Sequence, residues 1–234
     1  LWRMSRLGLS VPPAFVLSTR LCAAIVAGER HAEQAVSELI GEGLHHIERL
    51  TGRRFGDPRR PLLVSVRSGA EKSMPGMLET VLDVGMNDAT VVGLMRLTGN
   101  PRLAWDSYRR FIEGYAEVVA GLPRAPLEAE LAEVMARAKV ESDATLDPLS
   151  LEDLTRRYQA CAAAEGGAVL PADPHDQLLR AVLAVFRSWT APKAREYRRL
   201  NGLEHLQGTA VAVQAMVFGN AGPGSGAGVA FSRD

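Results

Sequence analysis

The feature that most constrains the fold is a long run of helical patterning that separates two stretches containing strands. Apolar residues recur at helical spacing from Asn87 to about Glu165, with breaks only at 99–101, 121–123 and Pro148. A run of this length is too long for one helix, so it predicts several packed helices. Because strand patterns occur before and after it, the order predicts an α+β fold with an inserted helical subdomain.

The elements on either side follow from the same periodicities. The expected strands are 14–17, 62–66 and 209–218. The expected helices are 18–27, 31–51, 174–190 and 192–201. We therefore expect a first α/β lobe at 1–86, the helical insertion at 87–173, and a return to the α/β lobe with the start of a second lobe at 174–234.

Charge and hydropathy exclude two classes of partner. Lysine plus arginine (27) equal aspartate plus glutamate (27), so no overall charge attracts nucleic acid or a membrane surface. No apolar run reaches the roughly 20 residues needed to cross a bilayer, and no signal peptide is evident. Cys22 and Cys161 lack disulfide or metal-ligand spacing and favour free thiols in a reducing compartment, so we expect a cytoplasmic protein.

Both ends of the chain look like cuts through a longer polypeptide. Residue 1 is leucine, and the strand-like pattern near the other end stops at Asp234 without a polar tail. We therefore expect a fold truncated at both ends.

The first candidate site is the segment after the strand at 62–66. Arg67 follows this strand directly, and its guanidinium suits phosphate oxygens. Ser68, Gly69 and Gly76 would let backbone N–H groups approach an anion. A surface loop with Arg67 in a structural ion pair explains the local pattern equally well.

The second and third candidates lie near the C-terminal end. Glycines at five positions between 219 and 228 form a possible lid over phosphates, although an ordinary hairpin turn is favoured on pattern alone. In the strand before them, alternation places Val211, Val213, Ala215 and Val217 on one face and Gln214 and Met216 on the other. A purine could lie against this strand, but a half-buried strand explains the pattern without a ligand. The five histidines are scattered, and no nucleophile–base pair or carboxylate pair is apparent.

Taken together, these segments resemble a known family. The motifs, in order, are SVRSGA at 65–70, SMPGM at 73–77, DSYRRFI at 106–112, AVFRSW at 184–189, VQAMVFGN at 213–220 and SGAGVAFSRD at 225–234. They closely resemble the nucleotide-binding domain of pyruvate, phosphate dikinases, in the same order and over nearly all of residues 7–234. Glu79 stands where the family often has aspartate, and Asp83 where asparagine is common.

The resemblance implies a fold and a reaction. The family's domain is ATP-grasp-like, with two α/β lobes around ATP and an inserted helical subdomain. The full-length enzyme converts ATP, pyruvate and phosphate to AMP, phosphoenolpyruvate and diphosphate. A histidine on another domain carries the phosphoryl group to a distant pyruvate site, so none of the five histidines here is expected to be phosphorylated. We expect the full-length enzyme to be a homodimer.

The resemblance also assigns roles to residues. Arg67, the expected catalytic residue, and Ser68 would contact ATP phosphates, where electrostatic stabilisation is the main catalytic effect. The adenine hinge would be Gln214, Ala215, Met216 and Val217. The phosphate-covering loop would contain Gly224, Ser225, Gly226 and Gly228. Mg²⁺ is implied with ATP, but its acidic ligands are expected beyond Asp234, and a lysine-bearing glycine loop is expected before Leu1.

Two other interpretations remain open. The chain could belong to a phosphoenolpyruvate synthase or an antibiotic phosphotransferase, although the DSYRRFI helix and the long insertion favour the dikinase. It could also be a non-catalytic nucleotide-binding or interaction module from a truncated gene. If the chain is part of a dikinase, we expect the fragment alone to be inactive.

Overall fold

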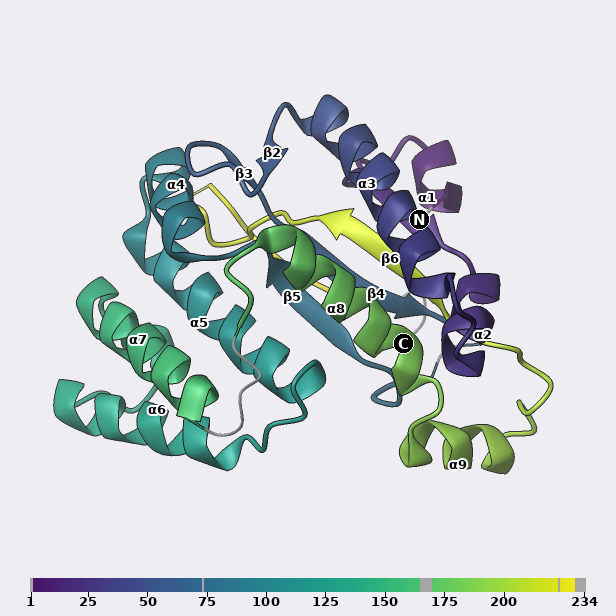
Figure 1. The fold of residues 1–234 in the computed structure, drawn as a ribbon. Helices are drawn as coiled ribbons and strands as arrows, with labels where there is room; N and C mark the ends of the chain where they lie inside the picture. Colours follow the sequence, from purple (N-terminus) through teal and green to yellow (C-terminus); the bar gives the residue numbers. More distant parts are fainter. Residues whose placement is uncertain (1, 73, 165–169, 223, 230–234) are drawn as a thin grey trace.

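The computed structural model describes residues 2–72, 74–164, 170–222 and 224–229 of the chain. Its centre is a four-stranded sheet in the order β1-β6-β4-β5, in which every neighbouring pair is antiparallel (Figure 1). The strands are β1 (Ala14–Leu17), β4 (Val64–Gly69), β5 (Thr80–Val84) and β6 (Ala210–Ala215). A short parallel pair, β2 (Arg54–Phe55) and β3 (Pro61–Leu62), lies between β1 and β4 in the chain.

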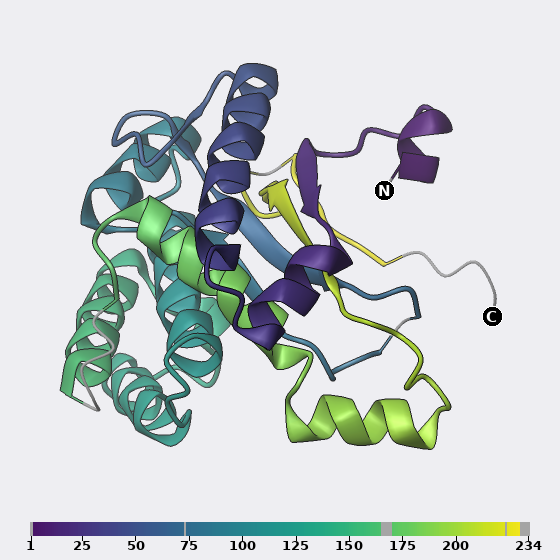
Figure 2. The ribbon, with the colours of Figure 1, turned by 45° about the vertical axis from the view of Figure 1, so that its right-hand side comes forward.

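Three helices cover one face of the sheet, namely α2 (Thr19–Ala27), α3 (Ala32–Thr51) and α8 (Pro174–Ser188). The strands alternate accordingly: Val64 and Val66 of β4 pair with Ala215 and Val213 of β6, and all four side chains are buried. In Figure 2, α3 and α8 lie on one side of the sheet, whereas α1 (Trp2–Arg6) and the yellow segment after β6 lie on the other. The sheet is therefore covered by helices on one face only.

The helical run between the strands forms α4 (Asp88–Thr98), α5 (Pro101–Val118), α6 (Ala125–Ala138), the 3₁₀ turn η1 (Asp143–Thr145) and α7 (Pro148–Ala164). Its boundaries are set by local chemistry. Asn87 caps α4 with a reciprocal bond to Thr90, Gly99 ends that helix in the left-handed region, and the Asn100 side chain caps α5. The expected breaks at 99–101, 121–123 and Pro148 are confirmed.

Helix α5 joins the helical run to the sheet. It packs against β5 and α8 on one side and against α4 and α7 on the other. Buried side chains of the helical run and of the α/β elements consequently form one hydrophobic cluster. Helix α9 (Pro192–Leu200) lies beyond α8 and leads back to β6 (Figure 1).

The predicted α+β class and most predicted elements are confirmed, but two strand predictions are wrong in detail. The strand expected at 62–66 is split into β3 and β4, and β4 continues to Gly69 because Ala210 pairs with that residue. Arg67 and Ser68 therefore lie within a strand rather than in a loop. The strand expected at 209–218 ends at Ala215, and β5 was not anticipated from the sequence. Among the helices that the structure describes, none combines the length and apolar character needed to span a bilayer.

Candidate functional site

The candidate site is the face of the sheet that the helices leave open. Arg67 on β4 lies opposite Ala212 on β6, and Ser65 lies opposite Gln214. Arg67 and Gln214 are thus on the same face of adjacent strands, in diagonal positions whose Cα atoms are roughly 7–8 Å apart. The register brings Arg67 and Gln214, which are far apart in the sequence, onto neighbouring strands.

The Arg67 side chain is exposed on this face. Its two neighbours across the ladder are Ala212 and Thr80, which are small and uncharged. No carboxylate of the described chain forms an ion pair with Arg67, so the alternative of a structural ion pair is not supported. A guanidinium in this position is available to an anionic ligand.

A pocket of about 420 Å³ lies at the end of β4, and its lining begins at Ser68, the residue after Arg67. It is lined by Ser68 and Gly69 of the strand and by Lys72, Met74 and Gly76 of the following loop, among others. Gly76 has a φ of 70°, a conformation that favours glycine. Lys72 adds a second cation that the sequence analysis did not select, although it lies between two of the recognised motifs.

The hinge segment is fixed by hydrogen bonds. The side-chain Nε2 of Gln214 donates to the Pro12 carbonyl at 3.0 Å. The backbone N–H groups of Ala215 and Met216 donate to the Pro13 and Leu63 carbonyls, each at 2.9 Å. Those two N–H groups are therefore engaged within the protein and are not available to a purine.

After Met216 the chain leaves the sheet, which changes the position predicted for Val217. Val217 does not continue the buried face of β6, because the strand has ended at Ala215. Val217 is 72% exposed. Within the described residues, its N–H group has no hydrogen-bond partner. The first backbone donor free to meet a ligand is thus at Val217.

The glycine-rich segment is exposed and folds back on itself. The Ser225 N–H donates to the Gly222 carbonyl at 2.9 Å, and a side chain at Gly219 would come within 2.6 Å of Ala227. The Asn100 amide holds the start of the segment through the Asn220 carbonyl at 3.3 Å. Gly224, Gly226 and Gly228 are exposed, and in the described part no hydrogen bond joins them to the sheet. A strand is expected from the sequence to begin at Val229, which the structure places outside any strand; the rest of that prediction, from residue 230 on, lies outside the described residues.

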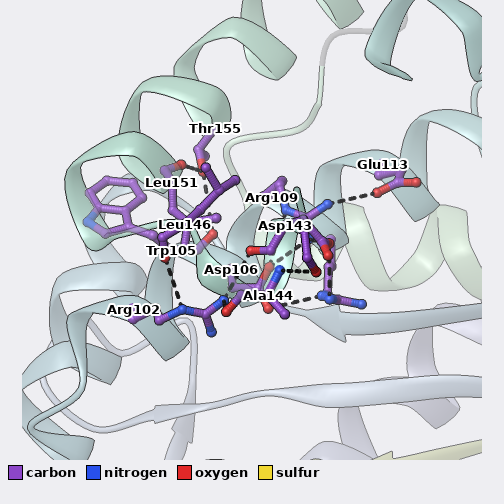
Figure 3. Close-up of polar contacts among 12 residues, drawn as sticks. Arg102, Trp105, Asp106, Arg109, Glu113, Asp143, Ala144, Leu146, Leu151 and Thr155 are labelled. Atoms are coloured by element: carbon purple, nitrogen blue, oxygen red, sulfur yellow. Dashed lines mark hydrogen bonds and ion pairs between the residues drawn. The ribbon is translucent and has the colours of Figure 1, made fainter. Parts of the chain in front are cut away.

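The DSYRRFI motif forms a structural network rather than a ligand site (Figure 3). Arg109, whose side chain is 3% exposed, contacts Asp106 at 2.6 Å and Asp143 at 2.9 Å. Arg110 contacts the second oxygen of Asp106 at 3.0 Å. Figure 3 also shows Arg102 bonded to the Ala144 and Leu146 carbonyls. These contacts attach η1 to α5.

Other kinds of chemistry find little support in the described residues. The five histidines are all exposed, as expected. The described part of the chain contains no group of three or more His, Cys, Asp or Glu side chains able to hold a metal ion. The described residues alone therefore do not fit a Mg²⁺ site.

These features define an α+β domain whose open sheet face presents an arginine and a neighbouring cationic pocket to an anionic ligand. The chain belongs to the family described as the pyruvate phosphate dikinase AMP/ATP-binding domain, whose model matches residues 29–234.

Named relatives agree with this membership. The chain is 44% identical over 232 residues to pyruvate, phosphate dikinase of Clostridium symbiosum, covering 99% of this chain and 26% of the relative. It is 45% identical over 231 residues to the Rhizobium meliloti (strain 1021) dikinase, with coverages of 99% and 26%. It is 45% identical over 232 residues to the chloroplastic dikinase 1 of Arabidopsis thaliana, with coverages of 99% and 24%. The chain thus spans about a quarter of the length of these relatives.

Proposed function

We propose that this chain is the ATP-binding part of a pyruvate, phosphate dikinase. In the full-length enzyme, ATP, pyruvate and phosphate would be converted to AMP, phosphoenolpyruvate and diphosphate, with a histidine on another domain carrying one phosphoryl group from this site to pyruvate. The observation that carries the proposal is that Arg67 and Gln214 lie on the same open face of adjacent strands.

The proposed binding mode follows the direction of β6. The base would lie at the strand end near Met216, where the exposed Val217 N–H can donate to it. The phosphates would extend toward Arg67, Ser68 and the pocket at the end of β4. The segment with Gly224, Ser225, Gly226 and Gly228 would close over them, since its exposed backbone can approach phosphate oxygens closely.

The chemical role of Arg67 in this proposal is electrostatic. Charge on the transferred phosphoryl group and its leaving oxygen is neutralised by a guanidinium that is already in place. Mg²⁺, when bound, would neutralise the phosphates further, and its ligands would come from beyond Asp234.

The proposal includes an ATP-grasp-like architecture. Residues 1–86 would form the first α/β lobe, 87–173 the helical insertion, and 174–234 the return to the lobe and the start of the second. The single-sided covering of the sheet supports this, because a second lobe could close over the open face. The proposed partners are phosphate, and the phosphohistidine and pyruvate-binding domains of the same chain, in a cytoplasmic homodimer.

Replacing Arg67 with glutamine tests the binding mode. We expect R67Q to weaken ATP binding by about 10-fold or more, because a charge-assisted contact is worth about 1.5–3 kcal/mol. Adenosine has no phosphates, so its affinity should not change. Arg96→Gln, at an exposed arginine on α4 without an ion pair in the described chain, is the matched control. Equal losses for ATP and adenosine, or none for ATP, would contradict the proposed role.

The reaction itself is tested in a chimera. The chain would replace the matching segment of the Clostridium symbiosum dikinase, and AMP formation from ATP and pyruvate would be measured with and without phosphate. Turnover that requires phosphate and releases diphosphate supports the dikinase. Turnover without phosphate would assign the chain to the synthase branch, and an intact chimera without turnover would favour a non-catalytic module.

A further inference from the structure

A second concentration of positive charge lies away from the sheet face, at the C-terminal end of α3 and in the β2–β3 segment. It consists of Arg49, Arg53, Arg54, Arg59 and Arg60, which we call the arginine cluster. Four of these residues are exposed and Arg53 is half-buried. Because the chain as a whole carries no net charge, this local excess is not a consequence of composition.

The arginine cluster forms no close ion pairs within the described chain, although the Asp57 carboxylate interacts with Arg54 and Arg59 at longer range. None of its members forms an ion pair with a described carboxylate. Three arginines of the helical run, Arg137, Arg156 and Arg157, are also exposed or half-exposed, yet each is paired.

The two carboxylates within the cluster are committed to the backbone. The Glu48 carboxylate accepts the Phe55 N–H at 2.9 Å. The Asp57 carboxylate accepts the N–H groups of Arg59 and Arg60 at 2.7 and 3.3 Å, and the first of these bonds is the main reason that the pKa of Asp57 is lowered. Both acids therefore shape the chain locally, and neither is paired with a guanidinium.

Three of the arginines, Arg49, Arg53 and Arg54, line one hollow of about 550 Å³ together with His45 and Glu48. The helix macrodipole accounts for Arg49, which lies in the last turn of α3. It does not account for Arg53 and Arg54, which follow the helix. The three guanidinium groups outnumber the single Glu48 carboxylate in the hollow, so a bound anion would offset their mutual repulsion.

The frame that holds these side chains is fixed. Gly52 ends α3 with a φ of 64°, and its N–H donates to the Glu48 carbonyl at 2.9 Å. The Phe55 side chain is buried, and the Arg54 N–H donates to the Arg60 carbonyl at 3.3 Å. The backbone on both sides of the hollow is thus ordered before any ligand arrives, which lowers the entropy cost of binding.

We propose that this hollow binds a compact phosphate-bearing polyanion at a site separate from Arg67. Guanidinium groups match phosphate oxygens in charge and geometry, and three of them can engage adjacent phosphates of one ligand. Helix α3 covers the face of the sheet opposite Arg67, so a single ligand does not reach both places (Figure 2). The inference does not depend on the proposed dikinase activity.

The experiment measures binding of inorganic tripolyphosphate by calorimetry in an Arg67→Gln background, which removes the contribution of the sheet face. We expect saturable binding that weakens as salt is raised. Replacing Arg49, Arg53 and Arg54 with glutamine should weaken it by about 10-fold or more. Arg195→Gln, an exposed arginine on α9 without an ion pair in the described chain, should leave it unchanged and serves as the matched control.

Two results would overturn the proposal. One is a triple variant that remains folded by circular dichroism and still binds tripolyphosphate as tightly as its parent. The other is an equal loss in the Arg195→Gln control, which would show attraction to surface charge in general. A second titration with ADP, in the Arg67→Gln protein and in the triple variant, separates the possible sources: a larger loss of ADP binding than of tripolyphosphate binding in the triple variant assigns the hollow to nucleotide phosphates, and a smaller loss assigns it to inorganic polyphosphate.

Discussion

At the scale of single residues, Asp83 is in an unfavourable position. It lies in β5 with a φ of 56°, a region that aspartate and asparagine tolerate better than other side chains. It is 5% exposed, and its Oδ1 atom has no hydrogen-bond partner in the described chain. The charged groups that influence it are Asp106 and Arg110 of α5.

The surroundings of Asp83 make stability depend on pH. Burial, followed by the charge of Asp106, raises its pKa from 3.8 to about 7, against a smaller opposing effect of Arg110. The folded protein therefore holds this proton more tightly than the unfolded chain. Between about pH 4 and pH 7 the unfolded state loses the proton first, so this group destabilises the fold increasingly as pH rises.

Asp83→Asn should remove this effect. Asparagine accepts the same backbone conformation and carries no charge, and it is the residue common at this position of the motif. We expect the free energy of unfolding to rise by about 1–3 kcal/mol at pH 8 and to change little at pH 4.5. Urea unfolding of both proteins at the two pH values measures this, and an equal gain at both would contradict a raised pKa.

Residue roles were only partly predictable from the sequence. The alternation that separates Gln214 from Val213 holds, but Arg67, which was expected just after a buried strand, lies within β4. It could not show that Val217 leaves the sheet, because strand length depends on a partner far away in the sequence. The positive φ of Asp83 could not be predicted either, because it follows from the irregular pairing of β5 with β4. The ATP-contact roles stay predictions.

At the scale of elements, α3 approaches the sheet closely at one glycine. A side chain at Gly43 would overlap the ring of Phe15 on β1, whereas a side chain at Gly41, two residues earlier in the same helix, would meet nothing within 4 Å. Gly43 is thus required by the contact between α3 and β1, and Gly41 is not.

The two glycines give a matched pair of variants. Gly41→Ala should stabilise the protein by about 0.5–1 kcal/mol, because alanine favours the helix. Gly43→Ala has the same helical advantage but must displace Phe15, so we expect a net loss of about 1–3 kcal/mol. Thermal unfolding compares them directly. Stabilisation by both would mean that β1 is not packed tightly on α3.

Helices were easier to predict than strands because their signals are local. Gly52 and Gly99 end their helices, and Asn100 with Pro101 begins the next, as the sequence indicates. Strand β5 escaped prediction because its five residues gain their stability from β4 and from α5. Such non-local contacts leave no periodic signal in so short a segment.

At the scale of the molecule, the helical run and the sheet share one core. Helix α5 carries buried residues that contact β5 and α8 as well as α7, so no layer of water separates the two parts. We therefore expect residues 87–173 to unfold together with the sheet, even though they form a separate unit in the chain.

Two buried tryptophans report on the two parts. Trp105 lies in α5 facing α7, and Trp189 follows α8, where the Arg198 guanidinium stacks 3.8 Å from the centre of its ring. Two variants would each keep one of these tryptophans, with Trp2 and the other one replaced by phenylalanine. Each should show a fluorescence transition in urea that coincides with the transition in far-UV circular dichroism. Separate midpoints for Trp105 and Trp189 would instead identify the helical run as an independent folding unit.

The pairing of β1 with β6 determines when the protein can fold during its synthesis. In the described chain β1 pairs only with β6, and Gln214 bonds to a residue 202 positions earlier. At about 5–20 residues per second, the ribosome needs on the order of 10–40 s to make the intervening chain. Throughout that interval β1 has no partner, and the β4 edge that β6 will occupy remains open to other strands. Because this internal strand is made last, the sheet cannot be completed until translation has passed β6.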